Sequence, residues 1–419
     1  MLLEVPHVRG GPVRLEPATA GRLRLLVVAG DADGNLGDRA LLTGLCDDLR
    51  SSGWPVELAT TARRISTGPG SLEIRTLSGS GTRKLTALRR AAAAADVVLW
   101  GGGGLLQDDD SLLKVPYWTA LLSLLRPLSR CTVAYSLGVG PLRRDFSRLL
   151  ARRALGCCDA VSTRDRRGQA LASQLTSSPV TLVPDPALLL CPASRRAARE
   201  WLRERGVPLD GRPVFGIAPR RWFPPRDRLL PHQLRSRFAP SPEARAGESE
   251  RLVDHVARAL SRIAGELDAH LLFLPSYAIP VEGDVEICRR MLAVCRRLQA
   301  RSGTVGQVEV IDDPRLYAAV TGTLDLMIGG RMHPTILAAS AGTPIVGIGY
   351  NPKFDGFFDL LDAAELQIGV AQVVAEGGAE ALERVIVSAL ERGAPRSDRV
   401  ERLRERVRRF NRELLGSYA

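Results

Sequence analysis

Lysine is almost missing from this chain. Only three of its 58 basic residues are lysines, and arginine supplies all the others. Aromatic residues make up 5% of the sequence and are not interleaved with basic residues, as they are on the stacking surfaces of single-strand nucleic-acid binders. The formal net charge of +12 therefore does not predict a nucleic-acid partner. It favours acidic substrates or an anionic membrane face instead.

Long apolar runs and patterned cysteines are absent as well. No stretch approaches the roughly 20 apolar residues that cross a bilayer, and residues 1–22 lack the basic start and apolar centre of a secretory signal. The seven cysteines are scattered, without a C-x-x-C pair or a Cys/His cluster. That argues against a disulfide framework and a structural zinc site. We expect a cytoplasmic protein, with peripheral contact at the inner membrane face left open.

Short apolar runs alternate with longer stretches of helical period. Apolar strands linked by helices build parallel sheets that are covered on both faces. The predicted fold class is α/β, with two doubly wound Rossmann-like domains facing a cleft. The predicted strands are Leu23–Ala29, Val56–Ala59, Asp96–Trp100, Thr132–Leu137, Ala160–Thr163 and Thr181–Val183, then Val214–Ala218, His270–Pro275, Val308–Ile311, Asp325–Ile328 and Pro344–Ile348.

The domain boundaries follow the same alternation. A Pro/Arg-rich segment, 222–249, is predicted to be a mobile loop at the cleft entrance. The tail carries an apolar stripe from Val400 to Leu414 and is expected to pack on the body, with membrane docking as the alternative. The predicted parts are a flexible leader at 1–22, an N-terminal domain at 23–190, a linker at 191–212, a C-terminal domain at 213–392 and a basic amphipathic helix at 393–419.

Glycines collect where strands of the N-terminal set end. Ligands of open parallel sheets bind outside the carboxyl ends of the strands, and glycine lets a backbone approach them closely. A helix expected to start near Asp38 would add N–H groups that favour an anion. Capping by Asp38 and close packing of chains are the alternatives for these loops. The residues concerned are Gly34, Asn35, Gly37 and Asp38 in GNLGD, and Gly102, Gly103 and Gly104 in WGGGGLLQDDD.

The C-terminal set delivers cations to its strand ends. Arg220 follows the strand at 214–218, Arg331 and His333 follow two glycines after a later strand, and Lys353 follows the next one. A guanidinium binds phosphate or carboxylate through its fork, and an imidazole transfers a proton near neutral pH. A lone histidine is more often a cap or a core residue, but the company of Arg331 favours a functional site.

An ordered set of motifs between Leu23 and Leu361 resembles the polysaccharide pyruvyl transferase family, and most of all its bacterial cell-wall branch. These motifs are GNLGDRALL, GGGGLLQD, SLGVGPL, STRD, DPALLL, GIAPR and GGRMHPTILAASAGTPIVGIGYNPK. The resemblance implies a fold similar to glycosyltransferase type B, with phosphoenolpyruvate as donor and a pyruvate ketal on a sugar as product. It places donor binding at Arg220, Arg331 and the adjacent Met332, and we add Lys353 from its position. The glycine loops fall on the acceptor side.

The resemblance thus implies an enzyme of polysaccharide biosynthesis. Its expected partners are phosphoenolpyruvate and a glycan or lipid-linked saccharide, with no nucleic acid. His333 is expected to donate a proton to the donor, while the arginines neutralise its charge, so that neither metal nor cofactor is required. Two alternatives stay open. One is a type B glycosyltransferase that uses a nucleotide sugar, and the other is a non-catalytic protein of a glycan pathway.

Overall fold

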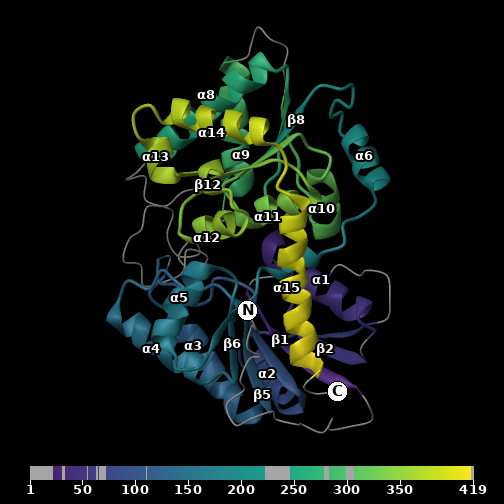
Figure 1. Cartoon of the computed structure of the whole chain (residues 1–419), viewed down its shortest axis with the longest axis vertical. Helices are drawn as coiled ribbons and strands as arrows, with labels where there is room; N and C mark the ends of the chain where they lie inside the picture. The colour runs from purple at the N-terminus through teal and green to yellow at the C-terminus, as the bar shows by residue number, and fades with distance from the viewer. Residues whose placement is uncertain are drawn as a thin grey trace.

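Each half of the chain folds around one parallel sheet with helices on both faces (Figure 1). The computed structural model describes residues 22–30, 34–53, 55–62, 65, 72–109, 111–221, 246–277, 283–298 and 306–416. Nearly all of the predicted leader and most of the Pro/Arg-rich segment, 222–245, lie outside the described residues. The predicted α/β fold with two Rossmann-like domains is confirmed.

The N-terminal sheet holds seven parallel strands in the order β3-β2-β1-β4-β5-β6-β7. All the predicted strands are present with slightly shifted bounds. β3 was not predicted, because its sequence EIRT is largely exposed and has no apolar run. The elements are β1 (Leu23–Val28), α1 (Leu36–Ser51), β2 (Val56–Thr60), β3 (Glu73–Thr76), α2 (Gly81–Ala94), β4 (Val97–Gly101), α3 (Lys114–Leu125), η1 (Arg126–Leu128), β5 (Cys131–Leu137), α4 (Asp145–Gly156), β6 (Ala160–Thr163), α5 (Arg166–Leu175), β7 (Val180–Leu182) and η2 (Pro186–Leu189).

The C-terminal sheet holds six parallel strands in the order β10-β9-β8-β11-β12-β13. Here β13 was missed, since three residues are too few to give a period. The elements are α6 (Arg195–Glu204), β8 (Val214–Ala218), α8 (Ala246–Glu266), β9 (His270–Phe273), α9 (Asp284–Leu298), β10 (Gln307–Val308), α10 (Pro314–Thr321), β11 (Leu326–Gly329), α11 (Met332–Ala341), β12 (Ile345–Gly349), α12 (Lys353–Leu360), η3 (Ala364–Leu366), β13 (Gln367–Gly369), α13 (Val370–Val374), α14 (Gly378–Arg392) and α15 (Ser397–Gly416).

Both sheets reverse their strand order at one point, between β1 and β4 in the first and between β8 and β11 in the second. Crossovers diverge at such a point and leave a crevice outside the carboxyl ends of the two strands, where ligands of doubly wound sheets bind. The loops after β1 and β4 carry the glycines, and those after β8 and β11 carry Arg220 and Arg331. The topology therefore places the predicted site residues at the two crevices.

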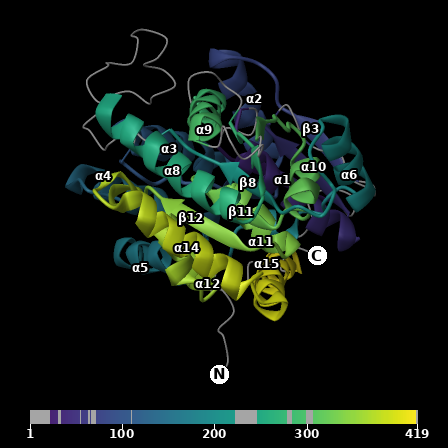
Figure 2. The same cartoon turned by 90° about the horizontal axis from the view of Figure 1, so that it is seen from above.

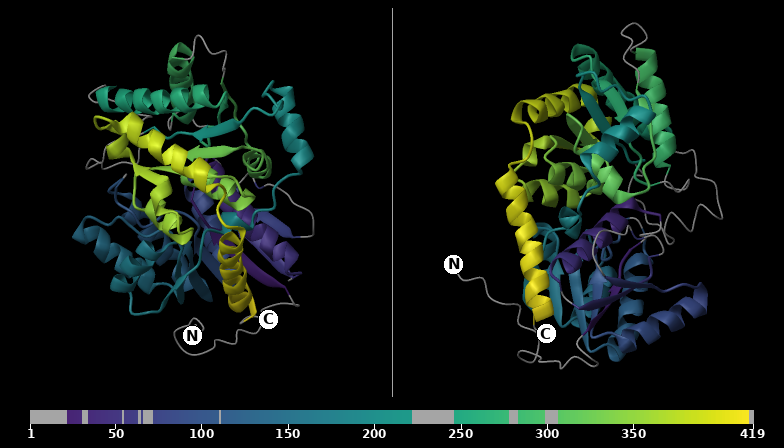
Figure 3. Two further views of the ribbon diagram at one scale, coloured as in Figure 1. Left: turned by 45° about the horizontal axis from the view of Figure 1, so that its top comes forward. Right: turned by 90° about the vertical axis from the view of Figure 1, so that its right-hand side faces the viewer.

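The last helix, α15, ties the domains together (Figure 3). Its Val400 and Leu403 are buried in the core of the second domain, whereas Val407 and Phe410 are buried under the N-terminal sheet. The Tyr135 hydroxyl donates a hydrogen bond of 2.8 Å to α15 at Asn411 Oδ1. The prediction that the tail packs on the body is confirmed. Its apolar stripe is covered by protein, so the alternative of membrane docking through this stripe is wrong.

The segment predicted as a linker, 191–212, contains α6, and Trp201 and Leu202 of this helix are buried in the core of the second domain. Those residues therefore pack as part of that domain. None of the described helices is long and apolar enough to span a bilayer.

Helix α1 belongs to the N-terminal domain but contacts α10 and α11 of the second (Figure 2). Asp47 on α1 forms a two-pronged ion pair with Arg315 on α10, through Nη1 to Oδ2 at 2.8 Å and Nη2 to Oδ1 at 2.5 Å. Both side chains are buried. Arg315 also donates to the Cys191 carbonyl at 2.7 Å. This pair fixes one domain against the other.

Replacing Asp47 by alanine should strongly destabilise the protein, because Arg315 would be left as a buried, uncompensated charge. Loss of one partner of such a pair costs about 3–5 kcal/mol. Urea unfolding followed by circular dichroism measures this. The matched control is Asp254→Ala, which removes an exposed pair with Arg258 and should cost less than about 1 kcal/mol. Equal unfolding midpoints for the two variants would contradict the role of Asp47.

Candidate functional site

The carboxyl ends of the two sheets meet across the interface between the domains. Asn35, just before α1, forms a bridge with Tyr277 after β9, and the Leu36 N–H donates to the Ser276 carbonyl at 3.2 Å. Farther along, Asn351 after β12 donates to Asp109 Oδ2 at 3.0 Å. Loops from both domains therefore form the walls of one site.

The predicted start of α1 near Asp38 needs correction. The helix begins at Leu36, and Asn35 caps it by accepting a hydrogen bond from the Gly37 N–H at 2.9 Å. Asp38 is buried instead, next to Gly30 and Gly103 of the two glycine loops. Asp38 therefore lies between the two glycine loops, and Asn35 caps the helix in its place.

The glycines of the WGGGG loop have structural reasons of their own. A Cβ at Gly102 would overlap the Leu41 side chain, and one at Gly104 would overlap Gln107. At Gly103 an added Cβ would make only ordinary contact with Asp38. Gly102 also has a φ of +75°, a left-handed conformation that favours glycine, so its backbone explains it without a ligand. The place of these glycines on the acceptor side stays a prediction.

His333 lies directly against Gly37 of the other domain. A Cβ at Gly37 would overlap the imidazole at Nδ1, so only glycine allows this approach. The imidazole is mostly buried, with its side chain 12% exposed. The sequence placed these two residues in separate loops, and the structure brings them into contact.

Asp185 completes the surroundings of His333. Its Oδ2 lies 3.4 Å from His333 Nε2 and 3.5 Å from Arg164 Nη1, while its Oδ1 accepts from the Ala187 N–H at 3.0 Å. Burial disfavours the ionised carboxylate, but His333 and Arg164 outweigh burial and lower the pKa of Asp185 below its ordinary value.

The Arg331 guanidinium, which the sequence predicted to bind the donor, binds a carboxylate of the protein instead. Its Nε donates to Asp284 Oδ2 at 3.0 Å and its Nη2 to Oδ1 at 2.6 Å. The fork expected to bind the donor is thus closed on a buried carboxylate at the start of α9. The neighbouring Met332 is buried in the core of the second domain, so its side chain does not line the site. Donor binding by these two residues stays a prediction.

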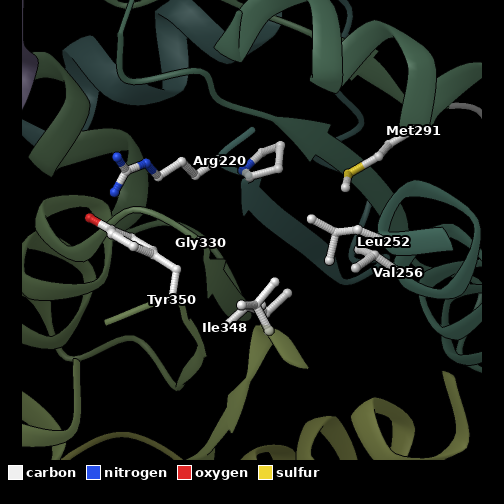
Figure 4. Close-up of a pocket in the computed structure, with 9 residues that line it drawn as sticks. Arg220, Leu252, Val256, Met291, Gly330, Ile348 and Tyr350 are labelled. Atoms are coloured by element: carbon white, nitrogen blue, oxygen red, sulfur yellow. The ribbon is translucent and has the colours of Figure 1, made fainter. Parts of the chain in front are cut away.

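Arg220 and Lys353 converge on one aromatic ring. The Arg220 guanidinium lies 3.8 Å from the centroid of Tyr350, and the Lys353 ammonium lies 4.7 Å from it. Figure 4 shows the Arg220 side chain reaching toward the hydroxyl end of Tyr350. Among the described residues, no carboxylate forms an ion pair with either cation. Two cations thus lie against one aromatic ring, whose π electrons attract both.

The electrostatics of this cluster follow from the excess of cations. Burial would raise the pKa of Tyr350, but Arg220, Lys353 and Arg331 together lower it to about 8. Burial and the nearby Arg220 and Arg164 lower the pKa of Lys353. The lowered pKa of Tyr350, which cations impose against the effect of burial, indicates a positive potential that suits a small anion with several charges.

An apolar pocket opens behind Arg220 and Tyr350 (Figure 4). The pocket is small and partly open to solvent. Its remaining lining residues are Pro219, Leu252, Val256, Met291, Gly330, Ile348 and Val370. The site therefore joins a cationic rim to an apolar wall.

Four side chains of this site were not among the predicted site residues: Arg164, Asp185, Asp284 and Tyr350. Three of them lie in motifs quoted above: Arg164 in STRD, Asp185 in DPALLL and Tyr350 in GIGYNPK. A charged or aromatic residue at the end of a predicted strand could have identified these three as site residues. Asp284 lies in no such motif. Within the described part of the chain, no three His, Cys, Asp or Glu side chains gather in a way that could hold a metal ion.

Comparison with known proteins agrees with this architecture. The chain is similar over 94% of its length to the UDP-GlcNAc 2-epimerase from Neisseria meningitidis bound to UDP-GlcNAc, covering 99% of that chain at 10% identity and a TM-score of 0.53. The epimerase from Methanocaldococcus jannaschii gives 94% and 99% coverage, 11% identity and a TM-score of 0.55. A glycosyltransferase from Rickettsia africae gives 96% and 95% coverage, 11% identity and a TM-score of 0.51.

These likenesses show the fold alone, which is of the glycosyltransferase type B kind. No curated protein sequence matches the chain. The family model described as polysaccharide pyruvyl transferase matches residues 35–352, a span that runs from the cap of α1 to the residue before Lys353 and includes Arg220, Arg331 and His333. The chain belongs to the polysaccharide pyruvyl transferase family.

Proposed function

We propose that this enzyme transfers the enolpyruvyl unit of phosphoenolpyruvate to sugar hydroxyls of a cell-surface polysaccharide or its lipid-linked precursor, forming a pyruvate ketal and releasing phosphate. One observation carries the proposal: Arg220 and Lys353 both lie against the ring of Tyr350. Neither of these cations has a carboxylate partner among the described residues. Phosphoenolpyruvate combines a phosphate and a carboxylate on three carbons. Such a compact anion matches clustered cations at a strand end.

On the donor side, Arg220 and Lys353 would bind the phosphate and the carboxylate directly. Arg331 would add charge that it shares with Asp284, and Arg164 would do so with Asp185. The charge of a guanidinium that is paired with a carboxylate is already largely offset. Such a guanidinium therefore positions neighbouring groups more than it neutralises a ligand. We therefore assign the larger part of donor affinity to Arg220 and Lys353.

The chemistry begins at His333. A proton moves from the imidazole to the methylene carbon of the donor, which becomes a methyl group, and positive charge develops on the neighbouring carbon. A sugar hydroxyl adds to that carbon and returns its proton to the imidazole, and the C–O bond to phosphate then breaks with its electron pair leaving on the phosphate. A second hydroxyl adds to the same carbon, gives its proton to the departing phosphate and closes the ketal. Asp185 supports the first step by orienting the imidazole, since its Oδ2 lies 3.4 Å from His333 Nε2.

The acceptor would enter from the N-terminal domain. Gly34, Asn35, Gly37 and the loop Gly102–Gly104 lie at the carboxyl ends of β1 and β4, and Gly37 touches His333. A hydroxyl held there would approach the donor carbon from the side opposite the cations of the second domain. No metal or further cofactor takes part in this scheme, since the cations of the chain carry the neutralisation.

Replacing Arg220 by alanine should weaken phosphoenolpyruvate binding by about 10- to 100-fold, because charge-assisted hydrogen bonds contribute about 1.5–3 kcal/mol each. Isothermal calorimetry measures this affinity. The matched control is Arg212→Ala, which removes an exposed arginine before the opposite end of the same strand and should bind normally. A protein that binds a nucleotide sugar but not phosphoenolpyruvate would refute the proposed donor.

Replacing His333 by glutamine should lower turnover by about two to four powers of ten, the usual contribution of a general acid, while donor affinity changes little. Release of phosphate in the presence of an acceptor glycan measures turnover, and calorimetry measures affinity. A His333→Gln enzyme that turns over normally would remove the imidazole from the mechanism.

Replacing Asp185 by asparagine should lower turnover by about tenfold or more, because the Asp185 carboxylate faces His333 Nε2 at 3.4 Å and orients the imidazole. Donor affinity should change little. Release of phosphate in the presence of an acceptor glycan measures turnover, and calorimetry measures affinity. The matched control is Asp284→Asn, which changes the other buried carboxylate of the site and should weaken donor binding more than turnover. Unchanged turnover in Asp185→Asn would leave Asp185 a purely structural residue.

A further inference from the structure

Exposed apolar side chains gather on α3 and α4. Of the eleven large hydrophobic side chains exposed in the described part of the chain, five belong to these helices or directly precede them: Leu113, Tyr117, Leu124, Phe146 and Leu149. Tyr117, Phe146 and Leu149 are the most exposed, at 60%, 61% and 63%. Scattered exposed apolar residues are normal, but a cluster marks an interaction site.

The cluster lies on the solvent-facing sides of two neighbouring helices. The helical repeat places Leu113, Tyr117 and Leu124 on a single stripe of α3. The Thr119 hydroxyl donates to the Leu150 carbonyl at 3.2 Å and joins α3 to α4. Both helices bury their opposite sides in the core of the N-terminal sheet. The apolar stripe therefore has no protein cover among the described residues.

Positive charge surrounds this stripe. Helix α2 packs beside α3 on the side away from α4, and together α2, α3 and α4 carry eight basic residues and one acidic residue. The outer surface of these three helices, here called the α2–α4 face, thus has a net charge of +7, against +12 for the whole chain. The excess of positive charge is concentrated on one side of the N-terminal domain.

We propose that the α2–α4 face docks on the surface of a bilayer that contains anionic phospholipids. Apolar side chains next to arginines are the composition of surfaces that lie in the interface of anionic membranes, where the apolar groups enter the acyl boundary and the cations meet the headgroups. Tyr117 and the half-buried Trp118, whose ring centroids are 5.1 Å apart, supply the aromatic groups that favour this depth.

A second copy of this chain fits the face less well. A symmetric dimer through it would place basic helix against basic helix, and like charges repel across a contact. A lipid surface offers the opposite charge over the whole area. Charge complementarity therefore selects the membrane.

The orientation follows from the fold. Helices α3 and α4 follow the loops that leave β4 and β5, so both begin at the carboxyl edge of the N-terminal sheet. That edge carries the glycine loops. A protein docked through the α2–α4 face would therefore keep the edge of its site close to the membrane surface, whichever donor it uses.

Flotation with vesicles tests this. The full chain should bind vesicles of phosphatidylglycerol mixed with phosphatidylcholine, should not bind vesicles of phosphatidylcholine alone, and should release at high salt, where screening shortens the electrostatic range. The Phe146→Ser/Leu149→Ser variant should lose at least about tenfold in affinity for the mixed vesicles. The affinity of the Arg152→Glu/Arg153→Glu variant for the mixed vesicles should fall by about the same factor or more.

Matched variants on the second domain control for general loss of apolar surface or charge. Leu209→Ser/Leu298→Ser and Arg289→Glu/Arg290→Glu should bind like the unmodified chain and melt at similar temperatures. Absence of binding to the mixed vesicles overturns the proposal, as does equal weakening by the control variants. A dimer in solution that Phe146→Ser/Leu149→Ser converts to a monomer, without vesicle binding, would instead make the face an interface between copies.

Discussion

The close approach of α1 to the second domain is the constraint on which the rest of the site depends. At its start, Gly37 lies against the His333 imidazole of the second domain, and about two turns farther along, Gly44 packs on the Pro186 carbonyl of its own domain. Neither contact leaves space for a Cβ. The buried pair of Asp47 and Arg315 then fixes the other end of the helix. Since one rigid helix carries all three contacts, the position of the glycine loop relative to the histidine is set by packing rather than by a flexible hinge.

Charge in the site is divided into two kinds. Arg331 and Arg164 each face a buried carboxylate, Asp284 and Asp185, so their positions are fixed in the absence of any ligand. Arg220 and Lys353 instead lie on the ring of Tyr350, and the attraction of the ring partly offsets their mutual repulsion. The lowered pKa of Tyr350, about 8, reports how much positive potential is left. An anion that binds here meets cations already in place, which reduces the cost of ordering them.

The sequence predicted most of the fold because apolar runs and glycine-bearing strand ends are local signals. The missed strands, β3 and β13, are an exposed strand and a three-residue edge strand, where the period fails. Pairings between distant residues could not be predicted in the same way. Nothing near Arg331 in the sequence points to Asp284, 47 residues earlier, and the contact of His333 with Gly37 depends on how the domains pack. The apolar stripe of α15 was predicted, but its packing on the cores of both domains was not. The sequence pattern of an apolar helix face is the same whether the helix covers one domain or two.

Arginine has two different roles in this chain, and the two groups of arginines differ in how far they are buried. In the site, guanidinium groups are packed against carboxylates or an aromatic ring, which gives them fixed geometry and a strong local field. On α2 and α4 they are exposed, so their charge is screened beyond about 10 Å at ordinary salt. Such charges cannot select a small ligand by geometry, but in number they attract an extended anionic surface. The net charge of the chain therefore says little by itself. Its distribution separates partly buried cations of fixed geometry, which suit a compact anion, from exposed cations, which suit a broad surface of opposite charge.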